Sequence, residues 1–151
     1  MTCAQSTTSA ASRRSRDVVI DYFFERRRKV LMARISADFD ADQARQLDRI
    51  AEALAAREPA LRAIYDFTDL TDLRIPAAEI AQRARKPTAV GGLRIIVSSR
   101  AMRGGMARDF SSKQSIAGER APMVVSSIEQ AYVLLDLGHK AKFVPFDPGI
   151  D

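Results

Sequence analysis

Arginines that follow a pair of serines are the feature of this sequence best suited to bind a ligand. Ser99 ends a strongly apolar run, and three arginines come soon after it: Arg100, Arg103 and Arg108. Guanidinium groups and the free N–H groups of a helix's first turn both bind anions, and such groups meet where parallel strands end. Together with Thr68, which follows an earlier apolar run, these residues predict a site for a small phosphate or carboxylate ligand. A solvated basic helix face would contain the same arginines, so that interpretation stays open.

The carboxylates, the one histidine and the one cysteine offer little for catalysis. Asp66, Asp69 and Asp72 recur every three residues after an apolar run. Carboxylates in such a place bind Mg²⁺ or, more commonly, cap a turn. His139 has no serine or cysteine partner suggested by spacing, and one histidine with Cys3 is too few for a zinc site. We therefore predict no catalytic residue, no metal and no cofactor.

Alternating apolar runs and helical periodicities give the elements that must position these residues. Strands are predicted over 18–24, 29–35, 61–67, 93–97 and 123–125. Helices are predicted over 40–57 and 76–85, over a segment that carries Met102, Met106 and Phe110, and after Ser126 as far as Gly138. The residues 68–72 are predicted to be a loop.

Local signals mark the ends of several elements. Asp40 with Gln43, and Ser126 with Glu129, have the spacing of a capping box at a helix N-terminus. Gly138 is placed to end the last helix. The arginines of the polar link 25–28 are expected at the tip of an antiparallel hairpin.

This order of elements predicts one α/β domain. Strands that alternate with helices favour a mostly parallel sheet with right-handed crossovers, and the opening hairpin adds an antiparallel edge. We expect about five strands in a mixed sheet and four helices, over residues 17–138. Residues 1–16 are expected to be a disordered basic leader, and residues 139–151 an irregular C-terminal tail.

The charge distribution argues against nucleic acid as the main partner. The net charge is +5, but three of the positive charges belong to Arg13, Arg14 and Arg16 in a leader without acids, so the rest carries only +2. Aromatic residues do not alternate with basic ones as they do on surfaces that bind single-stranded nucleic acid.

The sequence also indicates where the protein is found. It contains no run of about 18 apolar residues, which is the length that a membrane-spanning helix needs. A single cysteine favours a reducing compartment, so we expect a cytoplasmic protein.

Three short motifs resemble those of a known family. They are Tyr65-Asp66-Phe67-Thr68 at a strand end, the segment 104–110 (GGMARDF) in a helix, and Ser127-Ile128-Glu129-Gln130-Ala131 at the start of another helix. The chain is similar, over residues 17–138, to the small SpoIIAA-like proteins of bacteria and to STAS domains, the fold of the anti-sigma-factor antagonists. The resemblance implies a domain that works by binding other proteins.

The resemblance has one departure that concerns mechanism. The family's second helix starts with a phosphorylatable serine, and the aligned positions here read Arg74-Ile75-Pro76, with no hydroxyl. We therefore expect an interaction or regulatory module that is not an enzyme and lacks the usual phosphorylation switch. Its partner would be a protein, including a second copy of the chain, and its surface would run from Thr68 to Glu79. The alternative is a protein that binds an anionic or lipid-like small molecule between the strand ends and the third helix.

Overall fold

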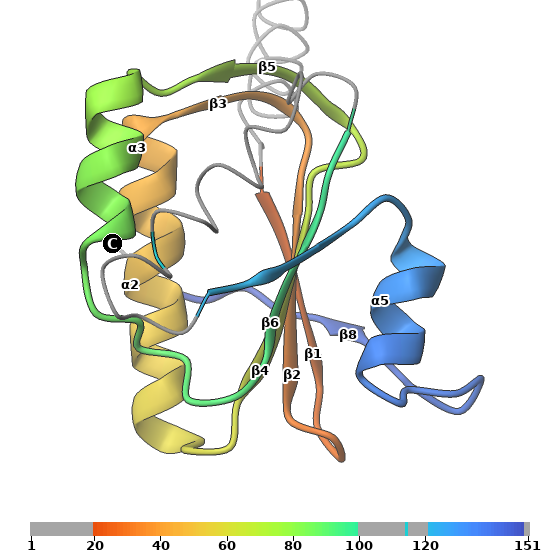
Figure 1. Ribbon diagram of the computed structural model, residues 1–151. Helices are drawn as coiled ribbons and strands as arrows, with labels where there is room; N and C mark the ends of the chain where they lie inside the picture. The colour runs from red at the N-terminus through yellow and green to blue at the C-terminus, as the bar shows by residue number, and fades with distance from the viewer. Residues whose placement is uncertain (1–19, 100–113, 115–120, 150–151) are drawn as a thin grey trace, which may run out of the picture.

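A six-stranded sheet with helices on both faces forms the centre of the molecule (Figure 1). The computed structural model describes residues 20–99, 114 and 121–149. The strand order in the sheet is β7-β6-β4-β2-β1-β8. None of the helices described has both the length and the apolar composition needed to cross a membrane.

The predicted mixed sheet is present. β1 (Ile20–Glu25) and β2 (Val30–Ile35) form the antiparallel hairpin, with Glu25 opposite Val30 at its end. β4 (Arg62–Asp66), β6 (Arg94–Val97) and β7 (Met123–Val125) then add in parallel to β2, one after another. The exposed arginines Arg26 and Arg27 lie in the hairpin turn, as the sequence predicts.

The helices divide the core into two parts. α2 (Ala41–Arg57) and α3 (Ala77–Ala84) lie on one side of the sheet, and the shorter α5 (Ile128–Leu134) lies on the other (Figure 1). Because side chains alternate along a strand, Leu31 and Ala33 of β2 pack toward α2, whereas Met32 packs toward α5. Two buried alanines, Ala44 of α2 and Ala131 of α5, bring the helices close to the sheet.

Two strands that the sequence analysis missed form a separate small sheet. β3 (Ala37–Asp40) pairs in parallel with β5 (Leu70–Arg74). The prediction of a loop over 68–72 is therefore wrong from Leu70 onward. Leu70 is buried against the core. The sequence does not show this strand because it pairs with a distant segment rather than with the neighbouring strand of a hairpin.

The C-terminal segment also contributes a strand. β8 (Val144–Pro145) pairs with β1, and the ring of Phe146 lies 6.0 Å from that of Tyr22. The segment 139–151 is therefore not wholly irregular, and the large sheet has six strands rather than five. A two-residue strand that contains a proline is too short to show a period of two in the sequence.

The helix ends agree with the sequence in one case and differ in two. At α2, Asp40 Oδ1 accepts from the N–H of Gln43 at 2.9 Å, and Gln43 Oε1 accepts from the N–H of Asp40 at 2.7 Å, which confirms the capping box. At α5 the cap is Ser127, one residue later than predicted. That helix stops at Leu134, and the left-handed residue after it is Asp136 (φ 54) rather than Gly138.

Three helices are described, and four were expected. The predicted helix that carries Met102, Met106 and Phe110 lies outside the described residues, as does the leader 1–16.

Candidate functional site

The parallel strands bring several polar side chains to one edge of the sheet. Asp66, the last residue of β4, is buried, and its Oδ1 accepts from the backbone N–H of Thr68 at 3.0 Å and from the Thr68 hydroxyl at 2.5 Å. Its Oδ2 lies 3.7 Å from Nε of Arg34 near the end of β2. The guanidinium of Arg34 also lies 5.4 Å from the centre of the Phe23 ring. Asp66 thus holds the turn after β4, a role that carboxylates commonly have at such a place.

Of the five residues predicted to bind an anion, the structure places two. Thr68 is exposed two residues after β4, and Ser99 is half-buried two residues after the neighbouring strand β6. The Ser99 hydroxyl oxygen is buried and has no hydrogen-bond partner in the described structure. Arg100, Arg103 and Arg108 lie outside the described residues. The five-residue site therefore stays a prediction.

The described residues contain no metal centre. No three side chains among histidines, cysteines, aspartates and glutamates in this part of the chain gather closely enough to hold an ion. Asp72 instead pairs with Nε of Arg74 at 3.1 Å, and His139 is exposed after α5.

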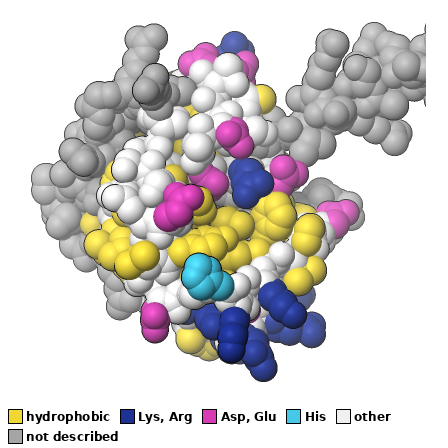
Figure 2. Space-filling view, turned by 90° about the vertical axis from the view of Figure 1, so that its right-hand side faces the viewer, with side chains coloured by type: hydrophobic (Ala, Val, Ile, Leu, Met, Phe, Trp, Pro, Cys, Tyr) yellow, Lys and Arg dark blue, Asp and Glu magenta, His cyan; other side chains and the backbone are white. Residues whose placement is uncertain are grey.

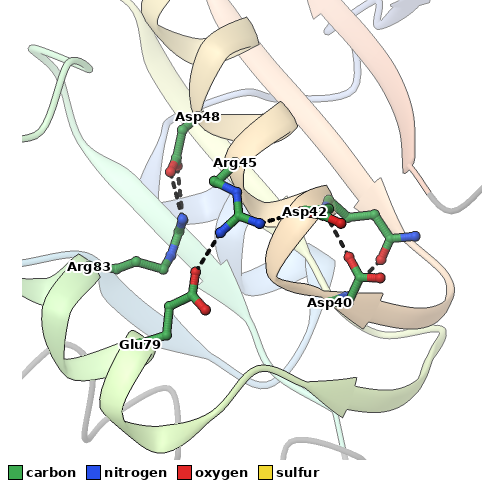
Figure 3. A network of polar contacts seen from close by, with 7 residues as sticks. Asp40, Asp42, Arg45, Asp48, Glu79 and Arg83 are labelled. Atoms are coloured by element: carbon green, nitrogen blue, oxygen red, sulfur yellow. Dashed lines mark hydrogen bonds and ion pairs between the residues drawn. The ribbon is translucent and has the colours of Figure 1, made fainter.

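A network of ion pairs joins α2 to α3 (Figure 3). Asp48 on α2 accepts two hydrogen bonds from Arg83 on α3, at 2.6 Å and 2.9 Å. Arg45 on α2 pairs with Asp42 one turn earlier and donates to Glu79 on α3 at 2.9 Å. The sequence analysis missed this network because its partners lie 34 or 35 residues apart, which no local spacing can show.

The predicted interaction surface from Thr68 to Glu79 is therefore partly built into the fold. Its middle is β5, and Glu79 is held by Arg45 rather than presented to a partner. Pro76 is the N-cap of α3 and gives it no side-chain hydrogen bond.

The opposite side of the sheet exposes apolar side chains. On α5, Ala131 is buried, while Val133 is 78% and Leu134 40% exposed. Met123 of β7 is 43% exposed on the same side of the sheet as Val125, which packs toward α5. We call this surface the α5 face; it consists of Met123, Tyr132, Val133, Leu134 and Phe143.

Figure 2 views the molecule from this side. Hydrophobic side chains form a belt across it, and lysines and arginines gather below the belt. The exposed basic residues of the hairpin turn and of the segment after α5 are Arg26, Arg27, Lys140 and Lys142. Within the belt the rings of Tyr132 and Phe143 lie 5.7 Å apart, and burial raises the pKa of Tyr132.

Comparisons with known proteins add one structural likeness. No protein-family model matches the sequence, and no curated protein is similar to it in sequence. Among solved structures, the chain is similar to the anti-sigma factor antagonist SpoIIAA in its unphosphorylated form, with a TM-score of 0.48 and 16% identity. The match covers 74% of this chain and 92% of that one.

Proposed function

We propose that this protein is a non-enzymatic, STAS-like interaction or regulatory module that binds a protein partner through the α5 face. The observation that carries the proposal is the exposure of Val133 and Leu134 on α5. Large apolar side chains grouped on one surface of a soluble domain commonly mark a site of contact with another macromolecule.

The exposed residues of α5 are not needed to hold the helix in place. Ala131 and Leu135 already bury the inward side of this segment against the sheet, together with Leu137. Arg62 of β4 also donates to the carbonyl of Leu135 at 2.9 Å, which fixes the end of the helix. Val133 and Leu134 are therefore available to a partner without any change in the fold.

The charges around the face indicate what kind of partner fits. Basic residues flank the apolar belt on the side of the hairpin turn (Figure 2). Protein interfaces place apolar anchors at the centre and complementary charges at the rim, where the charges mainly accelerate association. The partner is therefore expected to carry apolar anchors within an acidic rim.

The same module would act without a phosphorylation switch at its second helix. Pro76 occupies the N-cap position of α3, and Arg74 before it pairs with Asp38 at 3.0 Å and with Asp72. A phosphate group cannot be added where no hydroxyl exists. Control of binding would come from partner concentration or from another site.

A matched pair of variants tests the proposal. Val133→Glu places a carboxylate at the most exposed residue of the α5 face, and Ala53→Glu places one at an exposed position on α2. Each variant and the wild type would serve as bait, the enriched partner would be purified, and its dissociation constant would be measured for all three baits. We expect Val133→Glu to weaken binding at least about tenfold, as for an anchor residue of an interface, and Ala53→Glu to leave it unchanged.

Three results would contradict the proposal. One is equal binding by both variants. Another is a wild-type dimer in native mass spectrometry that Val133→Glu converts to monomer, because the α5 face would then bind a second copy of the chain rather than a different protein with an acidic rim. The third is binding of the wild type, but not of Val133→Glu, to anionic lipid vesicles, since basic and apolar residues also bind membranes.

A further inference from the structure

α3 is a short helix that lies beside α2 and buries little of its own surface (Figure 1). It has eight residues, of which one, Ala84, is buried, while Ala77, Ala78 and Gln82 are exposed. Its N-cap residue, Pro76, supplies no side-chain hydrogen bond. A helix of this length is not stable alone in water, so contacts with its neighbours must hold it in place.

Two ion pairs join α3 to α2 (Figure 3). Arg83 donates to both carboxylate oxygens of Asp48, and Glu79 accepts from Arg45. The side chains that α3 contributes, Arg83 and Glu79, are 17% and 26% exposed, so water and dissolved ions reach the edges of both pairs. Salt therefore weakens this attachment more than it would weaken a buried apolar contact.

The backbone hydrogen bonds at the two ends of α3 lie within the helix and its caps. The N–H groups of Glu79 and Ile80 donate to the carbonyl of Pro76, and the N–H of Lys86 donates to the carbonyl of Arg83. The helix can therefore move away from α2 as a unit without breaking these bonds.

The chain is anchored on both sides of α3. Before the helix, Arg74 ends β5 and pairs with Asp40 of β3. After it, Val90 is buried, and the N–H of Gly92 donates to the carbonyl of Leu61 at 2.9 Å. A movement of α3 is thus confined to the stretch between Arg74 and Val90.

A cavity of about 100 Å³ lies beside the ion pair of Arg83 and Asp48. Both residues line it, together with Ala51 of α2 and Tyr65 of β4. Atoms that line a void lack van der Waals contacts on one side, so the packing beside this end of α3 is incomplete. Separation of the ion pair would widen the cavity toward solvent.

We propose that α3 is a lid over this cavity, latched to α2 by the two ion pairs, and that it opens while the rest of the fold stays intact. Segments with few buried apolar contacts open at a lower free energy than the whole domain unfolds. Because the latch is ionic, the open form becomes more populated as ionic strength rises. The lid lies on the other side of the sheet from the α5 face, and it does not depend on the proposed partner.

Hydrogen exchange of backbone amides in the full-length protein, followed by NMR, tests the lid. Exchange would be measured at about 0.01 M and about 1 M sodium chloride, between which the Debye length falls from roughly 30 Å to roughly 3 Å. After correction for intrinsic rates, we expect amides 81–84 of α3 to exchange at least about tenfold faster than amides 47–54 of α2. The higher salt concentration should accelerate the α3 amides at least about twofold and leave the α2 amides unchanged.

Two acidic residues one turn apart on α2 supply the matched variants. Asp48→Asn removes the charge that holds Arg83, whereas Glu52→Gln removes the same charge from another residue that lines the cavity. We expect Asp48→Asn to accelerate exchange in α3 up to about fivefold and to reduce its salt dependence. Glu52→Gln should leave both quantities as in the wild type.

Three outcomes would overturn the inference. The first is exchange of the α3 amides at the rate of the α2 amides in the wild type, because α3 would then open only when the whole domain unfolds. The second is an equal effect of salt on both helices of the wild type, which needs no variant to detect. The third is equal acceleration by Asp48→Asn and Glu52→Gln, because the general charge of α2 would then explain the result.

Discussion

Arg83 of α3 and Asp48 of α2 form a two-pronged ion pair, with nitrogen–oxygen distances of 2.6 Å and 2.9 Å. α3 has eight residues, of which one, Ala84, is buried. Apolar packing therefore contributes little to its attachment, and the ion pair has a larger share in it. The Arg83 side chain is 17% exposed, so water screens the pair less than it screens Arg45, whose side chain is 51% exposed.

Replacing Arg83 tests this attachment. Arg83→Gln is expected to lower the free energy of unfolding by about 1 kcal/mol, the upper range for ion pairs near a surface. Arg45→Gln, which removes the more exposed cation of the same network, should lower it by less than Arg83→Gln does. Urea denaturation followed by circular dichroism measures both. Equal decreases in the free energy of unfolding for the two variants would show that the bidentate geometry of the Arg83–Asp48 pair does not add to stability.

Gly92 is required where the chain passes close to β4. A Cβ atom at this position would lie 2.6 Å from the carbonyl oxygen of Leu61 and 2.7 Å from Cγ of Arg62. Gly92→Ala is therefore expected to lower the free energy of unfolding by about 2 kcal/mol through overpacking. Gly138→Ala is the control, because a Cβ there meets nothing within 4 Å. It should be neutral, or stabilising by about 0.5 kcal/mol. Thermal unfolding of the two variants would separate them, and similar melting temperatures would contradict the close approach.

The sequence predicts those parts of the fold that depend on neighbours along the chain. The capping box at Asp40 links residues three apart, and the core strands show as continuous apolar runs. β5 and β8 are different, since each forms only because a distant strand offers free backbone groups. Their residues carry no strong pattern of their own, so the sequence analysis read them as a loop and as a tail.

The same reasoning explains which site residues could be found in advance. Thr68 and Ser99 follow apolar runs, so the sequence places both at the carboxyl ends of strands, where the structure has them. Arg94 was read only as part of a strand, and nothing near it indicates that its side chain lines a cavity with Lys86 and Tyr65. Contacts across the sheet and between helices set that arrangement, and a single sequence does not display them.

Asp66 holds the turn after β4, and its removal should be costly. The carboxylate accepts both the backbone N–H and the hydroxyl of Thr68 and lies beside Arg34. Asp66→Ala is expected to lower the free energy of unfolding by about 2 kcal/mol, because partly buried donors lose their acceptor. The exposed neighbour Asp69 provides the control, and Asp69→Ala should stay within about 0.5 kcal/mol of the wild type. Chemical denaturation measures the free energy of unfolding of both variants. A smaller decrease for Asp66→Ala than for Asp69→Ala would contradict the role assigned to Asp66.

The hydroxyl of Tyr22 is buried and has no hydrogen-bond partner in the described structure. Tyr22→Phe removes this group while keeping the ring that lies against Phe146. Because the polar atom loses water on folding and gains no partner, the variant is expected to be as stable as the wild type at pH 7, or up to about 1 kcal/mol more stable. A loss of 1 kcal/mol or more would show that the hydroxyl is hydrogen-bonded in solution.

The same variant should change the response to alkaline pH. Burial raises the pKa of Tyr22 above its ordinary value of 10.0, and it raises that of Tyr65 to about 12. Below pH 10 these hydroxyls are protonated in both folded and unfolded chains, so they do not affect the pH dependence. Above pH 10 the unfolded chain releases their protons first, and each group lowers the free energy of unfolding by up to about 1.4 kcal/mol per pH unit. Denaturation at pH 9, 10 and 11 should therefore show a shallower decline for Tyr22→Phe than for the wild type. Parallel declines would mean that Tyr22 ionises equally readily in the folded and unfolded chains.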